Sequence, residues 1–221
     1  MNKYDFRLED HQLDMLLGSM IKSFGKKDRE YVNSILDDVL EFYTGYGVTL
    51  DFRPGVRLSN KTRSAYIAGK RPLVGRVYPK RKKSFTLYKP FRVSEPIEQR
   101  RTVAHEVWHI IERDRKVKSS DTIREGTATY ADHLFIGDRL VEDIRNRDDP
   151  RFERLGTAKL IQDYMDENDI KNPLLVLLDL ETRDKIEDYV IRKAESPELP
   201  DDLMKKLRAA SLKIYPPMDE K

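Results

Sequence analysis

The sequence predicts an α+β fold in which helices flank a small mixed β-sheet. Two observations support this class. In the first part of the chain, apolar residues recur every three or four positions, as in an amphipathic helix, and then alternate with polar residues, as in a half-buried strand. After residue 95 the helical spacing returns and persists. At 221 residues the chain can bury a real core, either as one domain or as one domain with an appended helical segment.

Two helices are expected before the sheet, at residues 8–24 and 31–43. Gly45 and Gly47 follow the second pattern and are expected to end that helix. The apolar residues that define its buried face have helical spacing: Val32, Ile35, Leu36, Val39, Leu40 and Tyr43.

The period then changes to that of strands. At 48–52 apolar and polar residues alternate, which predicts a strand that Pro54 and Gly55 stop. Further strands are expected at 64–68, 73–78 and 84–88. The last two are expected to form a hairpin, with a basic tip between them.

A helix that carries the chemistry is expected to open at Ser94 to Pro96, because proline and acidic residues favour the first turn of a helix. It contains His105-Glu106-Val107-Trp108-His109. The two histidines stand at i and i+4, so they project from one face and can share one metal ion. Glu106 is offset around the helix axis, where it can reach a water on that metal without being a ligand.

A second helix of the site is predicted from near Asp121 to Gly137. Thr122 and Glu125 have the spacing of a capping box, which places Glu125 in the first turn. A glycine inside a helix, here Gly126, costs about 1 kcal/mol relative to alanine, which is reasonable where two helices must approach closely. Asp132 follows Glu125 by about two turns and lies on the same face.

The chain beyond Asp149 is helical by pattern. It contains one amphipathic stretch at 152–165, a continuous apolar run at 174–180, expected to be buried, and two further stretches at 186–190 and 203–212. These helices are expected to pack against the preceding part of the chain.

The histidine motif and its flanks resemble the extended pattern of the zincin metallopeptidases, with Thr102 and Val103 before it and Ile110 and Ile111 after it. The metzincin subclass is excluded, because the positions of its glycine and third histidine are Glu112 and Arg115. Residues 124–132, Arg-Glu-Gly-Thr-Ala-Thr-Tyr-Ala-Asp, are similar to the Glu-Gly-x-x-x-Tyr-x-acid segment of gluzincins, the minigluzincin-type enzymes included. The resemblance covers roughly 30 to 40 residues around the two helices.

This resemblance implies a zinc site with His105, His109 and Glu125 as ligands. It implies a zincin-like catalytic core at 1–140 and a helical C-terminal segment at 141–221 packed on it. Within the core, a small mixed sheet, the active-site helix and the Glu-bearing helix would form the site.

Two neighbouring side chains are candidates for supporting roles. Asp132 would accept the outer N–H of His105 or His109 and fix its tautomer. His133 is an alternative third ligand or a proton donor to the tetrahedral intermediate, although a structural role is the simpler reading.

The function that follows is zinc-dependent hydrolysis of peptide bonds in a peptide or protein substrate. Glu106 would be the general base on a zinc-bound water. An edge strand, either 73–78 or 84–88, would pair with the extended substrate. The oxyanion donor stays open, with His133, Tyr164 and Tyr189 as candidates. The sequence lacks the Gly-x-Met-Glu-Asn segment of aminopeptidase gluzincins, which favours an endopeptidase.

The amino-acid composition limits the possible metal ligands, cellular location and source of the protein. The chain has no cysteine, which excludes cysteine-ligated zinc and a thiol nucleophile and leaves histidine and carboxylate as ligands. The N-terminal residues are too charged for a signal peptide and no stretch has transmembrane length, so a cytoplasmic protein without a membrane partner is expected. Charged residues make up 37% of the chain while Asn and Gln are few, a balance that predicts a thermophilic source.

Three other functions fit parts of the pattern. The basic run Lys80 to Lys83 is compatible with a nucleic-acid-associated protease of the SprT-like family, but those enzymes use a third histidine, and a net charge of +3 does not favour a polyanionic partner. A zinc-binding regulatory or scaffold protein would keep the ligands without needing Glu106. A latent protease would hold its N-terminal helix or its C-terminal segment in the cleft.

Overall fold

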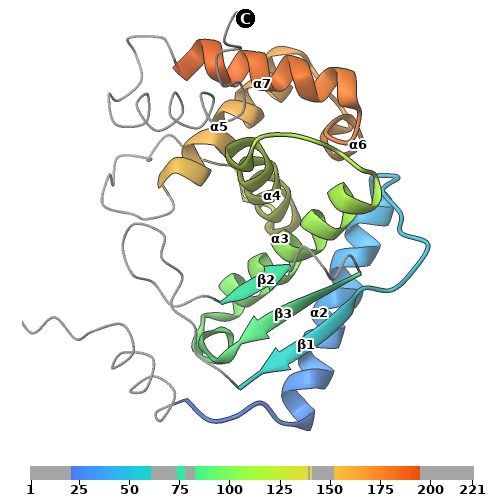
Figure 1. Cartoon of the computed structure of the whole chain (residues 1–221), viewed down its shortest axis with the longest axis vertical. Helices are drawn as coiled ribbons and strands as arrows, with labels where there is room; N and C mark the ends of the chain where they lie inside the picture. The colour runs from blue at the N-terminus through green and yellow to red at the C-terminus, as the bar shows by residue number, and fades with distance from the viewer. Residues whose placement is uncertain (1–20, 61–73, 78–82, 139, 141–151, 195–221) are drawn as a thin grey trace, which may run out of the picture.

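The structure, a computed structural model, describes residues 21–60, 74–77, 83–138, 140 and 152–194. In these residues it is a mostly helical α+β fold with six α-helices and a three-stranded mixed sheet (Figure 1), which confirms the predicted class. The expected strand at 64–68 and the expected helical stretch at 203–212 lie outside the described residues. So does most of the expected helix at 8–24, whose described end, residues 21–24, is not helical.

The elements follow one another in this order: α2 (Lys26–Gly45), β1 (Gly55–Ser59), β2 (Gly75–Val77), β3 (Ser84–Tyr88), the 3-10 helix η1 (Lys89–Val93), α3 (Pro96–Asp114), α4 (Asp121–Ile136), α5 (Phe152–Glu167), α6 (Pro173–Val176) and α7 (Leu180–Ala194).

Helix α3 occupies the centre of the molecule. It contacts the sheet and α2 on one side and α4 on the other, and α5 and α7 lie beyond α4 (Figure 1). Trp108 and Val107 of α3 are fully buried, as are Ile161 of α5 and Ile186 of α7, and all four belong to one continuous apolar core. The helices after residue 151 therefore pack on the part that holds the histidine motif.

The sheet has the strand order β1-β3-β2. Strand β3 pairs in parallel with β1 and antiparallel with β2, so that Phe85 faces both Val56 and Val77 in the register. The antiparallel pairing expected of the strands at 73–78 and 84–88 is confirmed, while residues 78–82, which include most of the expected hairpin tip, lie outside the described residues. Because β3 is paired on both sides, β1 and β2 are the two edge strands, whose outer sides pair with no strand in the described residues, and of these two β2 is the one that lies against α3.

The strand predicted at 48–52 is wrong. This segment has no strand partner in the described part of the chain, and the first strand begins at Gly55, where the prediction placed a turn. Its side chains nevertheless alternate in burial, with Val48 only 2% exposed. Alternation reports one-sided burial, which an extended segment packed on helices shows as well as a strand does.

Helix α4 begins at the predicted residue with a different cap. Ser120, and not Thr122, is the N-cap residue, and its Oγ accepts a hydrogen bond from the backbone N–H of Ile123. Glu125 consequently begins the second turn instead of lying in the first. Gly137 ends the helix with a φ of 81°, a left-handed conformation that favours glycine.

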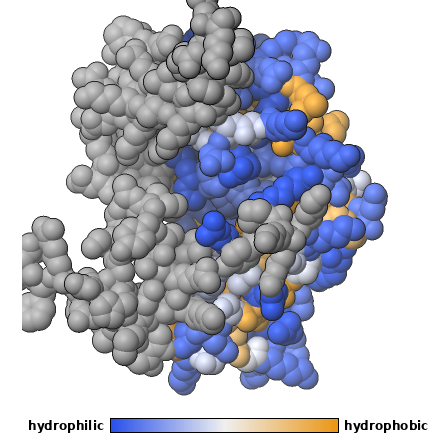
Figure 2. Space-filling model, in the orientation of Figure 1, coloured by the Kyte–Doolittle hydropathy of each residue, from blue (hydrophilic) through white to orange (hydrophobic). Residues whose placement is uncertain are grey.

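The apolar run at 174–180 is not continuously buried, which corrects its prediction. Leu174 and Leu177 are fully buried, but Leu175 is 50% and Leu180 is 55% exposed, because α6 is one short turn before the chain enters α7. None of the described helices is long and apolar enough to cross a membrane. The described residues on the face in Figure 2 are largely hydrophilic, with small apolar patches.

The close approach predicted at Gly126 is present between α4 and α5. A Cβ atom added at this glycine would lie 2.4 Å from Cγ2 and 2.8 Å from Cβ of Thr157. Gly126→Ala is therefore expected to lower the free energy of unfolding by about 1–2 kcal/mol in urea titrations, because a contact of 2.4 Å puts the overpacking cost at about 2–3 kcal/mol, the upper part of its usual range, and a gain of about 1 kcal/mol in helix propensity offsets part of it.

Gly45→Ala is the matched control for this variant. A Cβ atom at Gly45, the last residue of α2, would meet nothing within 4 Å in the described residues. This substitution should leave stability unchanged or raise it by up to about 1 kcal/mol. Equal stability of Gly126→Ala and the parent protein would contradict the tight contact between α4 and α5.

Candidate metal centre

Three side chains from two helices converge at the face of α3 that meets α4. Nε2 of His105 and Nε2 of His109 lie 3.2 Å apart, as expected for neighbours one helical turn apart. From α4, Glu125 places Oε2 at 3.4 Å from the Nε2 of His105 and Oε1 at 3.3 Å from the Nε2 of His109. The spacing of these atoms suits a group of metal ligands.

The separation of the two histidine nitrogens fits a tetrahedral zinc site. Metal–ligand bonds of about 2.0–2.1 Å at tetrahedral angles place neighbouring donor atoms about 3.3 Å apart. The two Nε2 atoms lie 3.2 Å apart, each of them faces a different oxygen of Glu125, and one donor atom from each of the three residues lies within 4.8 Å of the others. Three protein ligands would leave one tetrahedral position for water or substrate, which is the pattern of catalytic zinc sites.

The opposite edge of each imidazole contacts a carboxylate. His105 Nδ1 lies 3.1 Å from Oδ2 of Asp132, and His109 Nδ1 lies 3.4 Å from Oε2 of Glu112. An ionised carboxylate only accepts hydrogen bonds, so Nδ1 of each histidine is the donor. In a neutral imidazole, Nε2 then carries a lone pair directed at the other ligand atoms, and the convergence of such acceptors requires a cation or additional protons.

Asp132 thus lies where the sequence placed it, behind one of the two histidines, and the structure selects His105. Glu112 was missed as the corresponding partner of His109. Its position, one turn after His109 on the same helix, was a usable signal. In the sequence, the identity of residue 112 served only as evidence against the metzincin pattern.

Glu106 lies on α3 directly beneath β2. The backbone N–H of Val77 donates a hydrogen bond to its carboxylate, and a Cβ atom added at Gly75 would lie 3.0 Å from Glu106 Oε1 and 2.9 Å from Cγ2 of Thr102. Only a residue without a side chain allows the strand to lie this close. Glu106 Oε2 is buried and has no hydrogen-bond partner in the described residues, so it can accept a proton or bind a water.

Charges around the site favour a cation. Burial lowers the pKa of His105, but hydrogen bonds and charges from Asp132 and Glu125 outweigh it and raise the pKa to about 10. Burial likewise lowers the pKa of His109, and Glu112 and Glu125 raise it above its usual value. Protons and a metal ion therefore compete for the same positions.

The two glutamates of the site shift in opposite directions. Burial raises the pKa of Glu106 above its usual value, towards the range that suits a general base near neutral pH. Burial also acts to raise the pKa of Glu125, but hydrogen bonds and charges from His105 and His109 hold it well below the usual range. Glu125 is therefore an anion at any pH at which the protein would work.

His133 does not join the group of possible ligands. Its Nε2 lies 4.0 Å from Oδ1 of Asp132, its Nδ1 is buried without a partner in the described residues, and burial lowers its pKa. Tyr164 and Tyr189 pack edge-to-face with ring centroids 5.3 Å apart, and Tyr189 donates a hydrogen bond to Glu167. The hydroxyl of Tyr189, one of the candidate oxyanion donors, is therefore engaged at the end of α5.

Two arginines from the C-terminal helices contact carboxylates of the site, and no sequence pattern predicted either contact. Arg154 of α5 places Nη1 at 3.5 Å from Oε2 of Glu125, and Arg183 of α7 places Nη2 at 2.6 Å from Oε1 of Glu112. Neither arginine stands at a distance along the sequence that the histidine motif would predict. Glu106 and Asp132 bring the carboxylates of the centre to four, and only Glu112 and Glu125 pair with these two arginines, which leaves a surplus of negative charge that a divalent cation would neutralise.

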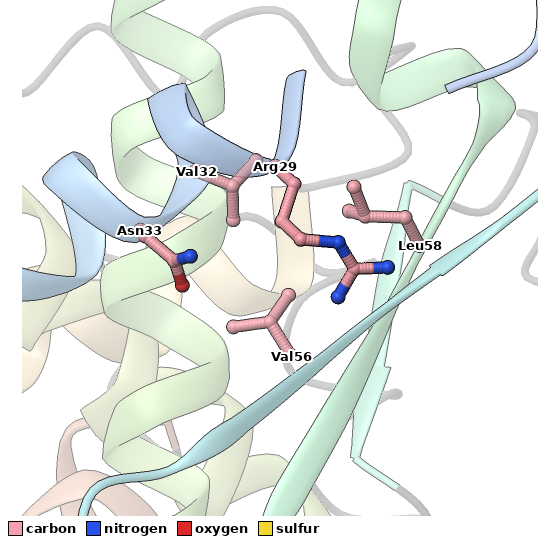
Figure 3. Close-up of a pocket in the computed structure, with 5 residues that line it drawn as sticks. All are labelled: Arg29, Val32, Asn33, Val56 and Leu58. Carbon is pink, nitrogen blue, oxygen red and sulfur yellow. The ribbon is translucent and has the colours of Figure 1, made fainter. Parts of the chain in front are cut away.

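A small hollow elsewhere does not share this chemistry. It lies between α2 and β1 and is lined by Arg29, Val32 and Asn33 of the helix and by Val56 and Leu58 of the strand (Figure 3). None of these side chains belongs to the histidine cluster. Comparisons with protein-family models, with curated proteins and with solved structures gave no match.

Proposed function

We propose that this chain is a zinc-dependent metalloendopeptidase with a zincin-like core of the gluzincin type. The observation that carries the proposal is the group formed by His105, His109 and Glu125, whose donor atoms lie within 4.8 Å of one another, with the two histidine nitrogens 3.2 Å apart as tetrahedral zinc ligands would be. A carboxylate at the third corner supports the gluzincin type over the SprT-like alternative. The histidine and carboxylate donors, without cysteine, suit zinc among the transition metals.

Residues around the group support catalysis as well as binding. A scaffold protein needs the ligands only, whereas here Glu106 is also buried beside them with an unpartnered carboxylate oxygen. Strand β2 lies over this residue, and no strand of the described residues pairs with its outer side. We propose that an extended peptide substrate pairs with this edge through main-chain hydrogen bonds, which would place its scissile bond near Glu106 with little selection by side chains.

Bound zinc would supply Lewis acidity, lowering the pKa of a water and polarising the scissile carbonyl. Glu106 takes the proton of the attacking water as the water oxygen forms a bond to the carbonyl carbon. The same carboxyl group then delivers that proton to the departing amine as the C–N bond breaks. Asp132 and Glu112 hold the Nδ1–H groups of His105 and His109, so that both Nε2 atoms keep their orientation.

The direct test is metal content followed by hydrolysis. Purified protein prepared without chelator should contain about one zinc per chain by elemental analysis. The zinc-loaded protein should cleave an unstructured protein such as casein, faster above room temperature, and phenanthroline should abolish the cleavage. Endopeptidase action predicts internal fragments by mass spectrometry, not the stepwise loss of N-terminal residues.

Three results would contradict the proposal, and each would reject a different part of it. Zinc content near zero after zinc is supplied would overturn the metal centre and everything built on it. Full zinc occupancy without cleavage across a broad peptide library, also after either terminus is trimmed, would favour the regulatory or scaffold function. Cleavage that survives removal of zinc would assign the activity to a contaminant or to another site.

A further inference from the structure

Arg183 is a charged residue that lies wholly inside the molecule. It is 0% exposed, on α7, and its guanidinium donates to four acceptors: Glu112 Oε1 at 2.6 Å, Ser119 Oγ at 3.0 Å, Thr127 Oγ1 at 3.1 Å and the carbonyl oxygen of Leu177 at 3.1 Å. Removing a charge from water is unfavourable, and only well-placed partners offset this cost. The guanidinium is therefore held in one orientation by groups from α3, from α4, from the loop before α4 and from the chain between α6 and α7.

The carboxylate of Glu112 divides its two oxygens between different partners. Oε1 accepts hydrogen bonds from Arg183 and from Oγ1 of Thr127, the latter at 2.9 Å, while Oε2 faces Nδ1 of His109. A carboxylate is planar, so fixing Oε1 on one side also fixes the direction of Oε2. The acceptor of His109 is thus oriented by a residue that lies 71 positions after Glu112 in the sequence.

We propose that Arg183 is a positioning residue of the metal centre. It holds Glu112 so that Oε2 receives the Nδ1–H of His109, and this contact directs Nε2 of His109 towards the metal. The inference rests on the proposed function in so far as the centre binds zinc. It assigns to α7, which carries no ligand, a direct part in zinc affinity.

The structure provides an internal control for this role. His105 has its own acceptor, Asp132, at 3.1 Å, and Arg183 donates a hydrogen bond to neither of these residues. Loss of the guanidinium should therefore affect the Nδ1–H of His109 and leave that of His105 unchanged. General loosening of the core would affect both.

The experiment compares zinc-loaded full-length variants with the parent. Arg183→Met and Glu112→Gln should each weaken zinc binding by about 10- to 100-fold, the usual effect of losing a partner behind a metal-bound histidine, as measured by competition with a chromophoric chelator. Arg183→Lys keeps the charge but not the planar array of donors, so it should recover only part of the affinity. In nitrogen-15 NMR spectra, the Nδ1–H of His109 should exchange faster in the Met variant, with that of His105 unaltered.

A double variant separates positioning from simple structural support. If Arg183 acts through Glu112, then combining Arg183→Met with Glu112→Gln should weaken zinc binding no more than Glu112→Gln alone. Additive losses would overturn the inference. Arg192→Met, on an exposed part of α7, is the matched control and should bind zinc like the parent.

If Arg183→Met does not fold, Thr127→Val tests the same role, because it removes the second donor to Glu112 Oε1 with little change in volume. It should shift the His109 signal in the same direction by a smaller amount. Folded Arg183 and Thr127 variants with parental zinc affinity and an unchanged His109 signal would overturn the positioning role. A parent protein that binds no zinc would instead overturn the proposed function.

Discussion

Glu106→Gln is expected to give a protein that binds zinc normally and has lost hydrolytic activity. The side chain is buried beneath β2 and is not one of the three groups whose atoms define the metal position, so zinc affinity should stay within a few-fold of the parent value. The amide cannot accept a proton from water. A positioned acid–base group is worth about 10²–10⁴-fold in rate, so kcat should fall by that factor, measured on an internally quenched peptide. Glu106→Ala should behave alike.

Asp114→Asn is the matched control, since it makes the same chemical change on α3 at an exposed position near the end of the helix. Its activity and zinc content should equal those of the parent. Retention of more than about a tenth of the parental kcat by zinc-loaded Glu106→Gln would contradict the general-base role. Loss of zinc together with activity would mean that Glu106 supports the metal, which the proposed mechanism does not allow.

Glu125→Ala is expected to lose most of its zinc affinity. The substitution removes both oxygens that face the histidines, together with a negative charge that offsets the charge of the metal. The dissociation constant should rise by more than about 100-fold, beyond the range seen when only an outer partner is lost. Isothermal titration calorimetry or chelator competition would measure this change.

The thermal stability of this variant should follow its zinc affinity. Free zinc at 100 times the parental dissociation constant stabilises the folded parent by about 2.7 kcal/mol, and the variant should lose most of that increment. Melting curves should be recorded with and without zinc, because the substitution also removes the partner of Arg154. The difference between the metal-free proteins isolates that second effect.

Asp121→Ala is the control on the same helix, at an exposed acid in the first turn of α4. It should change stability by less than about 1 kcal/mol and leave zinc affinity unaltered. Parental zinc binding by Glu125→Ala would place the third ligand elsewhere, with Asp132 and His133 the first residues to test. The gluzincin assignment would then fail, while a metallopeptidase of another type would remain possible.

The local parts of the fold were predictable because their determinants are local. The periodic apolar residues of α2, the proline and acids that open α3, and the glycine that ends α4 all act within a few residues of the position that they define. Strand β3 was predicted with its observed bounds, 84–88. The prediction of a strand at 48–52 was wrong for a related reason. Alternation shows which side chains are buried, whereas a strand also needs a partner for its backbone hydrogen bonds, and that partner comes from elsewhere in the chain.

The central part of the candidate site was predictable in the same way. His105 and His109 share a face because a helix repeats every 3.6 residues, and the same geometry places Asp132 on the face of α4 that carries Glu125. Such spacing cannot show which histidine Asp132 contacts. That choice depends on how α4 is placed against α3, which the spacing within either helix does not determine.

The sequence by itself therefore determined a helix with two histidines and a glutamate in fixed relative positions, a second helix with a carboxylate of suitable spacing, and a small sheet before them. Tertiary structure alone decided that β2 lies over Glu106 and that Arg183 orients Glu112 behind His109. The physical reason is the range of the interactions. Helix and strand periodicity act between residues a few positions apart, whereas ion pairs and hydrogen bonds inside a core join residues that only packing brings together.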